Sequence, residues 1–251
     1  MFLKQYGERR TGTNALRALI AANFEDVIVL MHILGDKHSP PVDLDGLWRE
    51  VQDADDAPWQ FISRATLDRP SLTTRSDNAW QSAEMRRHAA PLAQAFAAGA
   101  FGYVISIKNP YAWAVSIAKF TNWSRAVATE RLREACRVFN DCYRAWLPLL
   151  ERGPALLIRH EDLIRDTEGV LDRLGRTFGI RRSATFRPIE KLALPADWDD
   201  GPLPIGRSRF DAGRYLREEY LQALSPPQRD VVTSTMDWEL LGRFGYAPLA
   251  D

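Results

Sequence analysis

A charged segment near the start of the chain has the composition of an oxyanion-binding loop. Residues 7–14 have the sequence GERRTGTN. The spacing of their glycines, G-x-x-x-x-G, is typical of loops whose backbone N–H groups surround a phosphate at the N-terminus of a helix. Arg9 and Arg10 place two guanidinium groups inside the loop. The segment therefore predicts an anion site, and the alternative interpretation is a tight glycine turn with solvated arginines.

The end of this loop departs from the nucleotide-binding loop of kinases. Thr13 and Asn14 follow Gly12, where a Walker A loop has a lysine that reaches the terminal phosphates and a serine or threonine that holds Mg²⁺. The loop geometry is thus expected without the residues for metal-dependent phosphoryl transfer.

A second candidate anion site lies in the middle of the chain. Lys108 directly follows the apolar run 103–107, and it precedes Asn109 and Pro110, a combination typical of a helix start. Ser116 lies about two helical turns beyond Asn109 and so faces the same side of that helix. We expect Lys108 and Ser116 near the carboxyl end of a strand, where ligands of open α/β sheets bind. The alternative is an ordinary helix cap followed by a helical serine.

The elements that must position these segments follow from the apolar pattern. Short apolar runs predict strands at 27–31, 103–107 and 155–158, and the short mixed run at 2–6, which ends at Gly7, is a candidate first strand. Amphipathic spacing predicts helices over 13–24, 110–120, 126–150 and 166–178, and one helix that follows a capping box at 225–228 and reaches residue 241. The order predicts an α/β fold in three layers, with a mainly parallel central sheet, helices on both faces and a P-loop-like turn after the first strand.

Length and composition limit the kinds of protein that this chain can be. The 251 residues suit a single domain, 1–251, in which the polar stretch 35–78 is a variable loop, lid or acceptor-binding region. The net charge of zero gives no general attraction to nucleic acid. We expect no membrane span or signal peptide, and hence a cytoplasmic protein. Cys136 and Cys142 show no metal or disulfide spacing, so we expect both to be reduced and no metal to be bound.

Three motifs give the chain a family resemblance. Residues 10–14, RTGTN, resemble the 5′-phosphosulfate loop of sulfotransferases that use 3′-phosphoadenosine 5′-phosphosulfate. Lys108-Asn109-Pro110-x5-Ser116 resembles their 3′-phosphate motif, with lysine in place of the usual arginine. Residues 159–163, RHEDL, resemble the Arg-Tyr-Glu-Asp-Leu segment of the family, and FGY at 244–246 resembles a family ending. The motifs occur in family order, and the first three each follow an expected strand.

The resemblance implies a binding site for the sulfate donor, and the chain departs from the family pattern at two positions. It assigns the 5′-phosphosulfate to Arg10, Thr11, Gly12, Thr13 and Asn14, with Arg9 as a further cation of the loop, and the 3′-phosphate to Lys108 and Ser116. Ala15 stands where cytosolic members have an adenine-stacking tryptophan, and His160 replaces the family's tyrosine. Adenine packing must therefore come from elsewhere. Glu161 and Asp162 are expected to have structural roles near Arg159.

The general base is sought among four histidines: His32, His38, His88 and His160. Lys37 and His38 follow the second expected strand and resemble the basic-plus-histidine segment in which the family has its base. We therefore predict His38 as the base, in neutral form near its unperturbed pKa of ~6.5, and Lys37 as a stabiliser of the sulfuryl or bridging oxygen. Glu8 is the rival base, His32 is a third choice, and an ordinary polar loop is the alternative.

Taken together, these residues predict a metal-free sulfuryl transfer from 3′-phosphoadenosine 5′-phosphosulfate to a hydroxyl or amine. Arg10 is expected to stabilise the transferring group. The alternatives are a P-loop kinase and a non-catalytic nucleotide-binding module. The acceptor is not indicated: a carbohydrate, a lipid-linked glycan and a small alcohol or phenol stay open. Three arginines could close over the 3′-phosphate or form an exposed basic patch: Arg207, Arg209 and Arg214. Five tryptophans could stack on an acceptor or lie in the core: Trp48, Trp59, Trp80, Trp113 and Trp123.

Overall fold

A parallel sheet forms the centre of the computed structural model, which describes residues 1–30, 36–38, 91–92, 94–95, 98–120, 128–151, 153–188 and 212–249. Its strands are β1 (Phe2–Tyr6), β2 (Ile28–Leu30), β3 (Phe101–Ile107) and β4 (Ala155–Arg159). They lie in the order β2-β1-β3-β4, and each neighbouring pair is parallel. The expected parallel α/β sheet is confirmed, and β1, the first strand in the chain, lies in its interior.

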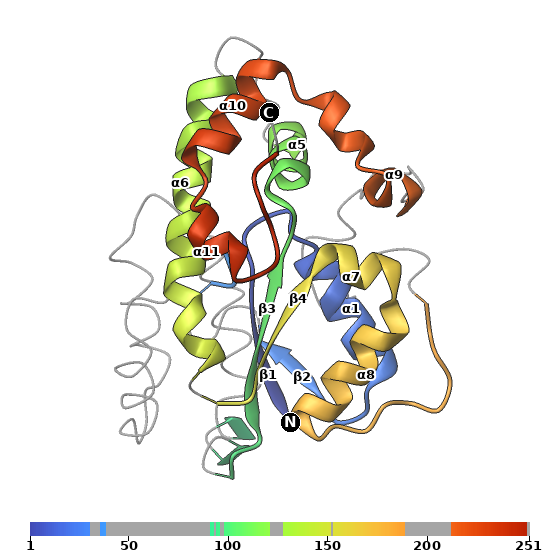
Figure 1. Cartoon of the computed structure of the whole chain (residues 1–251). Helices are drawn as coiled ribbons and strands as arrows, with labels where there is room; N and C mark the ends of the chain where they lie inside the picture. The colour runs from blue at the N-terminus through green and yellow to red at the C-terminus, as the bar shows by residue number, and fades with distance from the viewer. Residues whose placement is uncertain are drawn as a thin grey trace.

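Helices cover both faces of this sheet (Figure 1). One face is covered by α1 (Thr13–Asn23), α7 (His160–Arg165) and α8 (Thr167–Phe178), and the other by α6 (Ala128–Trp146), α10 (Pro226–Thr235) and α11 (Trp238–Gly242). Alternate strand residues supply the two cores, because successive side chains of a strand point to opposite faces. Leu3 and Val104 pack in the core on the α1 side, whereas Tyr6 and Ile105 pack in the core on the α6 side.

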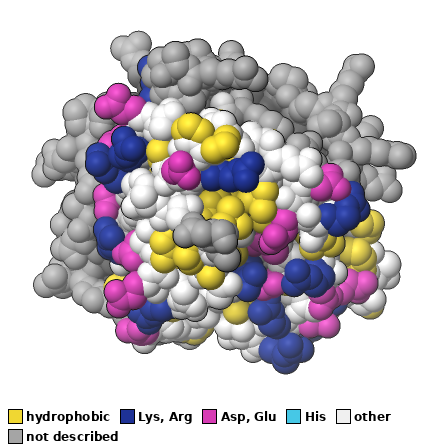
Figure 2. Space-filling model, turned by 45° about the horizontal axis from the view of Figure 1, so that its top comes forward, with side chains coloured by type: hydrophobic (Ala, Val, Ile, Leu, Met, Phe, Trp, Pro, Cys, Tyr) yellow, Lys and Arg dark blue, Asp and Glu magenta, His cyan; other side chains and the backbone are white. Residues whose placement is uncertain are grey.

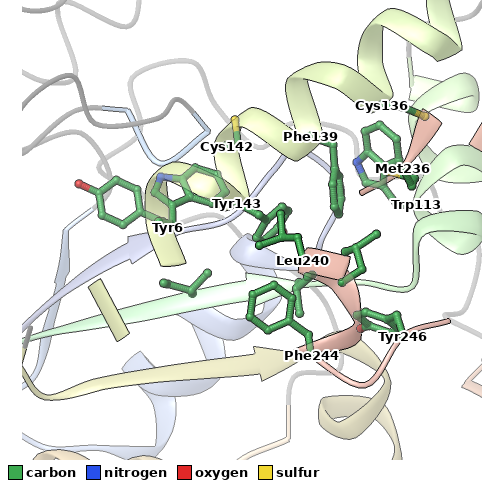
Figure 3. Close-up of a cluster of buried hydrophobic side chains, with 14 of the residues drawn as sticks. Tyr6, Trp113, Cys136, Phe139, Cys142, Tyr143, Met236, Leu240, Phe244 and Tyr246 are labelled. Atoms are coloured by element: carbon green, nitrogen blue, oxygen red, sulfur yellow. The ribbon is translucent and has the colours of Figure 1, made fainter. Parts of the chain in front are cut away.

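Aromatic side chains fill the space between the sheet and α6 (Figure 3). Tyr6 of β1 stacks on Trp146 with ring centroids 5.6 Å apart, and Tyr143 meets the same indole edge-on at 5.1 Å. Cys136 and Cys142 lie in this cluster as fully buried cysteines that form no disulfide, and burial raises the pKa of Cys136 to about 12. Such aromatic pairs add about 0.5–1.5 kcal/mol each beyond the burial of their area, so this face of the sheet is held rigidly against α6.

Most of the observed helix ends agree with those predicted from the sequence. Asn109 caps α5 (Pro110–Phe120) as predicted, because its Oδ1 accepts a hydrogen bond from the Tyr111 N–H at 2.9 Å. The α-helix expected over 126–150 ends at Trp146 and continues as the 3₁₀ helix η1 (Leu147–Leu150). Pro148 explains this change, since proline has no N–H with which to continue the α-helical pattern.

The prediction of one helix from the capping box at 225 to residue 241 is wrong. The Ser225 N–H does donate to Gln228 Oε1 at 2.9 Å, as a capping box requires. However, α10 ends at Thr235, and α11 begins after Asp237, whose Oδ1 accepts a hydrogen bond from the Leu240 N–H at 3.1 Å. An aspartate at this position satisfies the free N–H groups of a new helix and therefore favours the break.

Two short elements complete the described chain. The helix α9 (Ala212–Leu216) and the 3₁₀ helix η2 (Glu219–Ala223) precede α10. Among the helices of the described ranges, none combines the length and the apolar character that crossing a membrane requires.

Candidate anion-binding site

The two candidate anion-binding segments leave neighbouring strands at the same edge of the sheet. β1 and β3 pair in parallel, with Tyr6 opposite Ile105, so Gly7 and Lys108 both follow carboxyl ends of strands. The helices that follow, α1 and α5, consequently begin at this edge as well. A hydrogen bond of 2.9 Å from Trp113 Nε1 to the Arg9 carbonyl joins α5 directly to the loop 7–12. The expected proximity of the two segments is therefore present.

The loop of residues 7–12 has a backbone that requires glycine at position 12. Gly12 has a φ of 87°, and a Cβ placed on it would lie 2.6 Å from His160 Nδ1. Arg10 adopts a φ of 71°, and the Thr11 N–H and hydroxyl both donate to the Glu8 carbonyl, at 3.2 and 2.6 Å. Gly12 is also the N-cap of α1 and supplies no capping side chain. The first N–H groups of α1 are thus set up to donate to an anion.

The side chains of this loop divide into exposed and buried groups. Arg9 and Arg10 are exposed, whereas Thr11 and Thr13 are buried. Asn14 is half-buried, and its Oδ1 accepts a hydrogen bond of 2.6 Å from Lys37 Nζ. The predicted Lys37 is therefore brought to the start of α1, with its side chain almost completely buried.

Residues 36–38 are fixed to Gly7 by main-chain contacts. The Gly7 N–H donates to the Lys37 carbonyl at 2.9 Å, and His38 Nδ1 lies 2.6 Å from the Gly7 carbonyl. Within the segment, the His38 N–H donates to Asp36 Oδ1 at 2.7 Å. Because the Gly7 carbonyl oxygen can only accept a hydrogen bond, His38 Nδ1 carries the proton and His38 Nε2 keeps its lone pair. His38 thus has the tautomer of a base that would act through Nε2.

The expectation that His38 titrates near 6.5 is wrong. Burial, together with the positive charge of Lys37, lowers the pKa of His38 to about 3. The imidazole is therefore neutral over the physiological range. An anion bound beside it would raise this pKa, because a nearby negative charge favours the protonated form.

Glu8, the rival base, is buried beneath the loop. Its Oε2 lies 3.8 Å from Cys142 Sγ of α6, and its N–H points to the Tyr143 hydroxyl at 3.5 Å. The same hydroxyl donates to the Ser106 carbonyl at 2.6 Å. Burial raises the pKa of Glu8 to about 7, against the opposing effect of Arg9. This carboxyl group therefore changes protonation near neutral pH.

Lys108 and Ser116 converge as the sequence predicted. Lys108 Nζ donates to Ser116 Oγ at 2.8 Å, and Ser116 Oγ donates in turn to the Ala112 carbonyl at 3.0 Å. Lys108 is 2% exposed. Tyr215 of α9 completes the group, with its ring centroid 4.5 Å and its hydroxyl 3.4 Å from Lys108 Nζ. Sequence reasoning missed Tyr215, and the only signal for it was its place beside Arg214.

His160 stands between the two candidate anion sites. On one side it closes on Gly12, and on the other it meets Tyr215 edge-on, with ring centroids 5.7 Å apart and planes at 84°. Burial and the charge of Lys108 lower the pKa of His160 to about 3, so the ring is neutral. The loop 7–12 and the pair Lys108–Ser116 thereby share one uncharged aromatic wall.

The acidic residues of the third motif make structural contacts, with partners other than Arg159. Glu161 accepts a hydrogen bond from the Asn109 N–H at 2.9 Å and another from the Tyr246 hydroxyl at 2.7 Å. Asp162 lies 3.9 Å from both Arg165 and Arg173, in loose ion pairs. Glu161 thus ties the start of α5 to the C-terminal FGY segment.

Several predicted groups fall outside the described residues. They are the region 35–78 apart from 36–38, the arginines at 207 and 209, the side chain of Arg214, and His32, His88, Trp48, Trp59, Trp80 and Trp123. Trp113 is described, and it is 1% exposed in the core. No group of three or more metal-ligating side chains occurs within the described residues.

Charges of both signs are interspersed on the face shown in Figure 2, around central patches of hydrophobic side chains. This agrees with the net charge of zero. Attraction of an anion must therefore come from the local groups at the sheet edge.

Comparison with known proteins gives a likeness in structure only. No family model matches the sequence, and no curated protein matches it. The structure aligns with the sulfotransferase domain of the Synechococcus PCC 7002 olefin synthase, at 17% identity and a TM-score of 0.47, over 98% of this chain and 94% of that one. It also aligns with a sulfotransferase domain from the curacin biosynthetic pathway, at 16% identity and a TM-score of 0.42, over 99% of this chain and 98% of that one. With TM-scores below 0.5, neither alignment assigns an activity to the chain.

Proposed function

We propose that this chain is a sulfotransferase that moves a sulfuryl group from 3′-phosphoadenosine 5′-phosphosulfate to a hydroxyl or amine. The observation that carries the proposal is that two candidate anion sites lie at one sheet edge, with His160 between them. A nucleotide with phosphate groups at both its 5′ and 3′ positions presents two anions on one small molecule. A P-loop kinase has lysine and then serine or threonine where this chain has Thr13 and Asn14. This difference favours the bisphosphorylated donor over a nucleoside triphosphate.

In this proposal the loop holds the 5′-phosphosulfate and the second site holds the 3′-phosphate. The N–H groups at the start of α1 donate to the 5′ group, and Arg9, Arg10 and Lys37 supply positive charge. Lys108 and Ser116, already 2.8 Å apart, supply charge and a hydroxyl for the 3′ group. Holding the donor at two points fixes the sulfur atom relative to the acceptor, which lowers the entropic part of the barrier.

The chemical step then needs a base and a stabilised leaving group. The acceptor oxygen or nitrogen forms a bond to sulfur while the bond from sulfur to the bridging oxygen breaks. The electron pair of that bond stays on the 5′-phosphate, and the acceptor proton goes to His38 Nε2. Lys37 and Arg10 stabilise the negative charge that develops on the bridging oxygen. The products are the sulfated acceptor, adenosine 3′,5′-bisphosphate and a protonated His38.

Ligand binding tests the donor. The purified chain is titrated with adenosine 3′,5′-bisphosphate in the absence of Mg²⁺, and separately with Mg·ATP and Mg·GTP, in a thermal-shift assay and by calorimetry. We expect the bisphosphate to bind and to raise the melting temperature without metal. Protection by Mg·ATP or Mg·GTP alone would replace the proposal with the kinase alternative.

Transfer of labelled sulfate tests the chemistry. The labelled donor is offered with carbohydrate, lipid-linked glycan and small alcohol or phenol acceptors. His38→Ala should lower the rate of transfer by about 10²–10⁴-fold, the usual size of a general-base contribution. Binding of the bisphosphate should persist in this variant. Glu8→Gln should keep most of the activity if His38 is the base. Should Glu8→Gln abolish transfer and His38→Ala spare it, the two roles are exchanged. Binding without transfer to any acceptor class would support the non-catalytic module.

A further inference from the structure

The ammonium group of Lys108 is held from two sides. Ser116 Oγ lies 2.8 Å from Nζ, and the ring of Tyr215 covers it with the centroid at 4.5 Å. Lysine is a point charge on a stem with four rotatable bonds, whereas arginine presents a planar fork that is already shaped for a phosphate. A buried lysine in an anion site therefore depends on its neighbours for its position, and Tyr215 is one of them.

Tyr215 is itself fixed, although it comes from a distant part of the chain. It lies 107 residues from Lys108 in the sequence. The edge of its ring meets His160, and its other neighbour is Tyr220 of η2, with centroids 6.3 Å apart. The helix α9 packs against α7 and η2. Tyr215 is half-buried, and its hydroxyl lies at the Lys108 ammonium, 3.4 Å from Nζ.

The described contacts of Tyr215 reach Lys108 directly and approach the loop 7–12 through His160. The described ring and hydroxyl contacts of Tyr215 include Lys108, and the wall residue His160 separates Tyr215 from the loop at Gly12. Removing the Tyr215 side chain should therefore disturb the Lys108 site and spare the loop. This asymmetry distinguishes an effect on ligand selection from a general loss of binding.

We infer that Tyr215 is the positioning residue that gives the Lys108–Ser116 site its preference for a nucleotide carrying a 3′-phosphate. Its ring holds the Lys108 ammonium by a cation–π contact, and its hydroxyl adds a hydrogen-bond donor beside that ammonium. This inference rests on the proposed function, since it concerns the second anion site of the same donor.

The test compares two ligands that differ only in the 3′-phosphate. Dissociation constants for adenosine 3′,5′-bisphosphate and adenosine 5′-phosphate are measured by calorimetry for the wild type, Tyr215→Phe and Tyr215→Leu. Tyr215→Leu should weaken bisphosphate binding on the order of tenfold and leave adenosine 5′-phosphate within about twofold. Tyr215→Phe, which keeps the ring and loses the hydroxyl, should lie between the wild type and Tyr215→Leu.

Two controls separate a positioning role from a structural one. Leu216→Ala changes the next residue of α9, which is 41% exposed, and should leave both dissociation constants unchanged. In a double-mutant cycle, Tyr215→Leu should cost little affinity once Lys108→Ala is present, because Tyr215 acts through that ammonium.

The outcomes keep the inference and the proposed function apart. If the wild type binds neither nucleotide, the proposed function fails. If the wild type prefers the bisphosphate and both Tyr215 variants keep that preference, the inference is wrong while the proposed function stands. Equal weakening of both ligands in Tyr215→Leu, or full additivity with Lys108→Ala, would also overturn the inference.

Discussion

The indole of Trp113 donates a hydrogen bond to the carbonyl of Arg9 at 2.9 Å, and so the helix that follows Lys108 holds the loop that precedes α1. Trp113→Phe keeps an aromatic ring in the core but leaves this carbonyl without its donor. We expect it to lower the free energy of unfolding by about 1–3 kcal/mol and to weaken binding of adenosine 3′,5′-bisphosphate, as measured by urea unfolding and calorimetry.

Trp238 offers a matched control for Trp113. Its Nε1 donates to the Thr233 carbonyl at 2.7 Å, so this bond joins α11 to α10 and not to the loop. Trp238→Phe should lower stability to a similar extent and leave nucleotide affinity unchanged. Equal affinity losses in the two variants would show that the Trp113 bond has no special relation to the loop.

Gly12→Ala should remove nucleotide binding while the fold persists. Alanine at a φ of 87° is strained, and its Cβ would have to displace the His160 ring. We expect at least a tenfold loss in affinity for adenosine 3′,5′-bisphosphate, which corresponds to about 1.4 kcal/mol. The control is Gly179→Ala at the end of α8, where φ is also positive at 63° but the added Cβ meets no atom within 4 Å. That variant should lose about 1 kcal/mol of stability and bind normally.

Acidification should destabilise the protein through two half-buried histidines, His38 and His160. The pKa values of His38 and His160 are lowered to about 3, whereas unfolded histidine titrates near 6.5. The unfolded state therefore binds more protons between about pH 3 and 6.5, so stability is complete above this window and falls as the pH drops. Each histidine contributes a slope of up to about 1.4 kcal/mol per pH unit. Urea unfolding between pH 4.5 and 7 should give a shallower slope in His38→Asn and in His160→Asn, and an unchanged slope would show that these histidines do not have lowered pKa values in the folded protein.

Glu8 should have the opposite effect at higher pH. Burial raises its pKa to about 7, so the folded state holds a proton that the unfolded state has lost, and stability decreases as the pH rises from about 4.5 to 7. Glu8→Gln is therefore expected to be more stable than the wild type at pH 8, by an amount on the order of 1–3 kcal/mol, and to approach it near pH 4. Guanidinium unfolding at the two pH values measures the difference, and a less stable Glu8→Gln at pH 8 would refute the assignment.

The sequence predicted what depends on local pattern. The strand Phe2–Tyr6 has the predicted bounds, since the short mixed run ends at Gly7. Lys108 meets Ser116 because helix geometry sets their spacing. The sequence could not predict the contact of Tyr215 with Lys108, because it depends on how α9 packs, 107 residues farther along the chain. The low pKa of His38 was missed for a related reason, since the burial that lowers it is created by tertiary packing.

The position of β1 between β2 and β3 has a consequence for how the chain acquires its structure. Phe2 pairs with Ile28 on one side and with Phe101 on the other, so the second pairing joins residues separated by roughly a hundred positions, and closing so large a loop costs entropy before any contact compensates for it. During synthesis, the ladder on that side of β1 has no partner until β3 emerges from the ribosome. We therefore expect slow refolding, and an early species in which one edge of the first strand is open to aggregation.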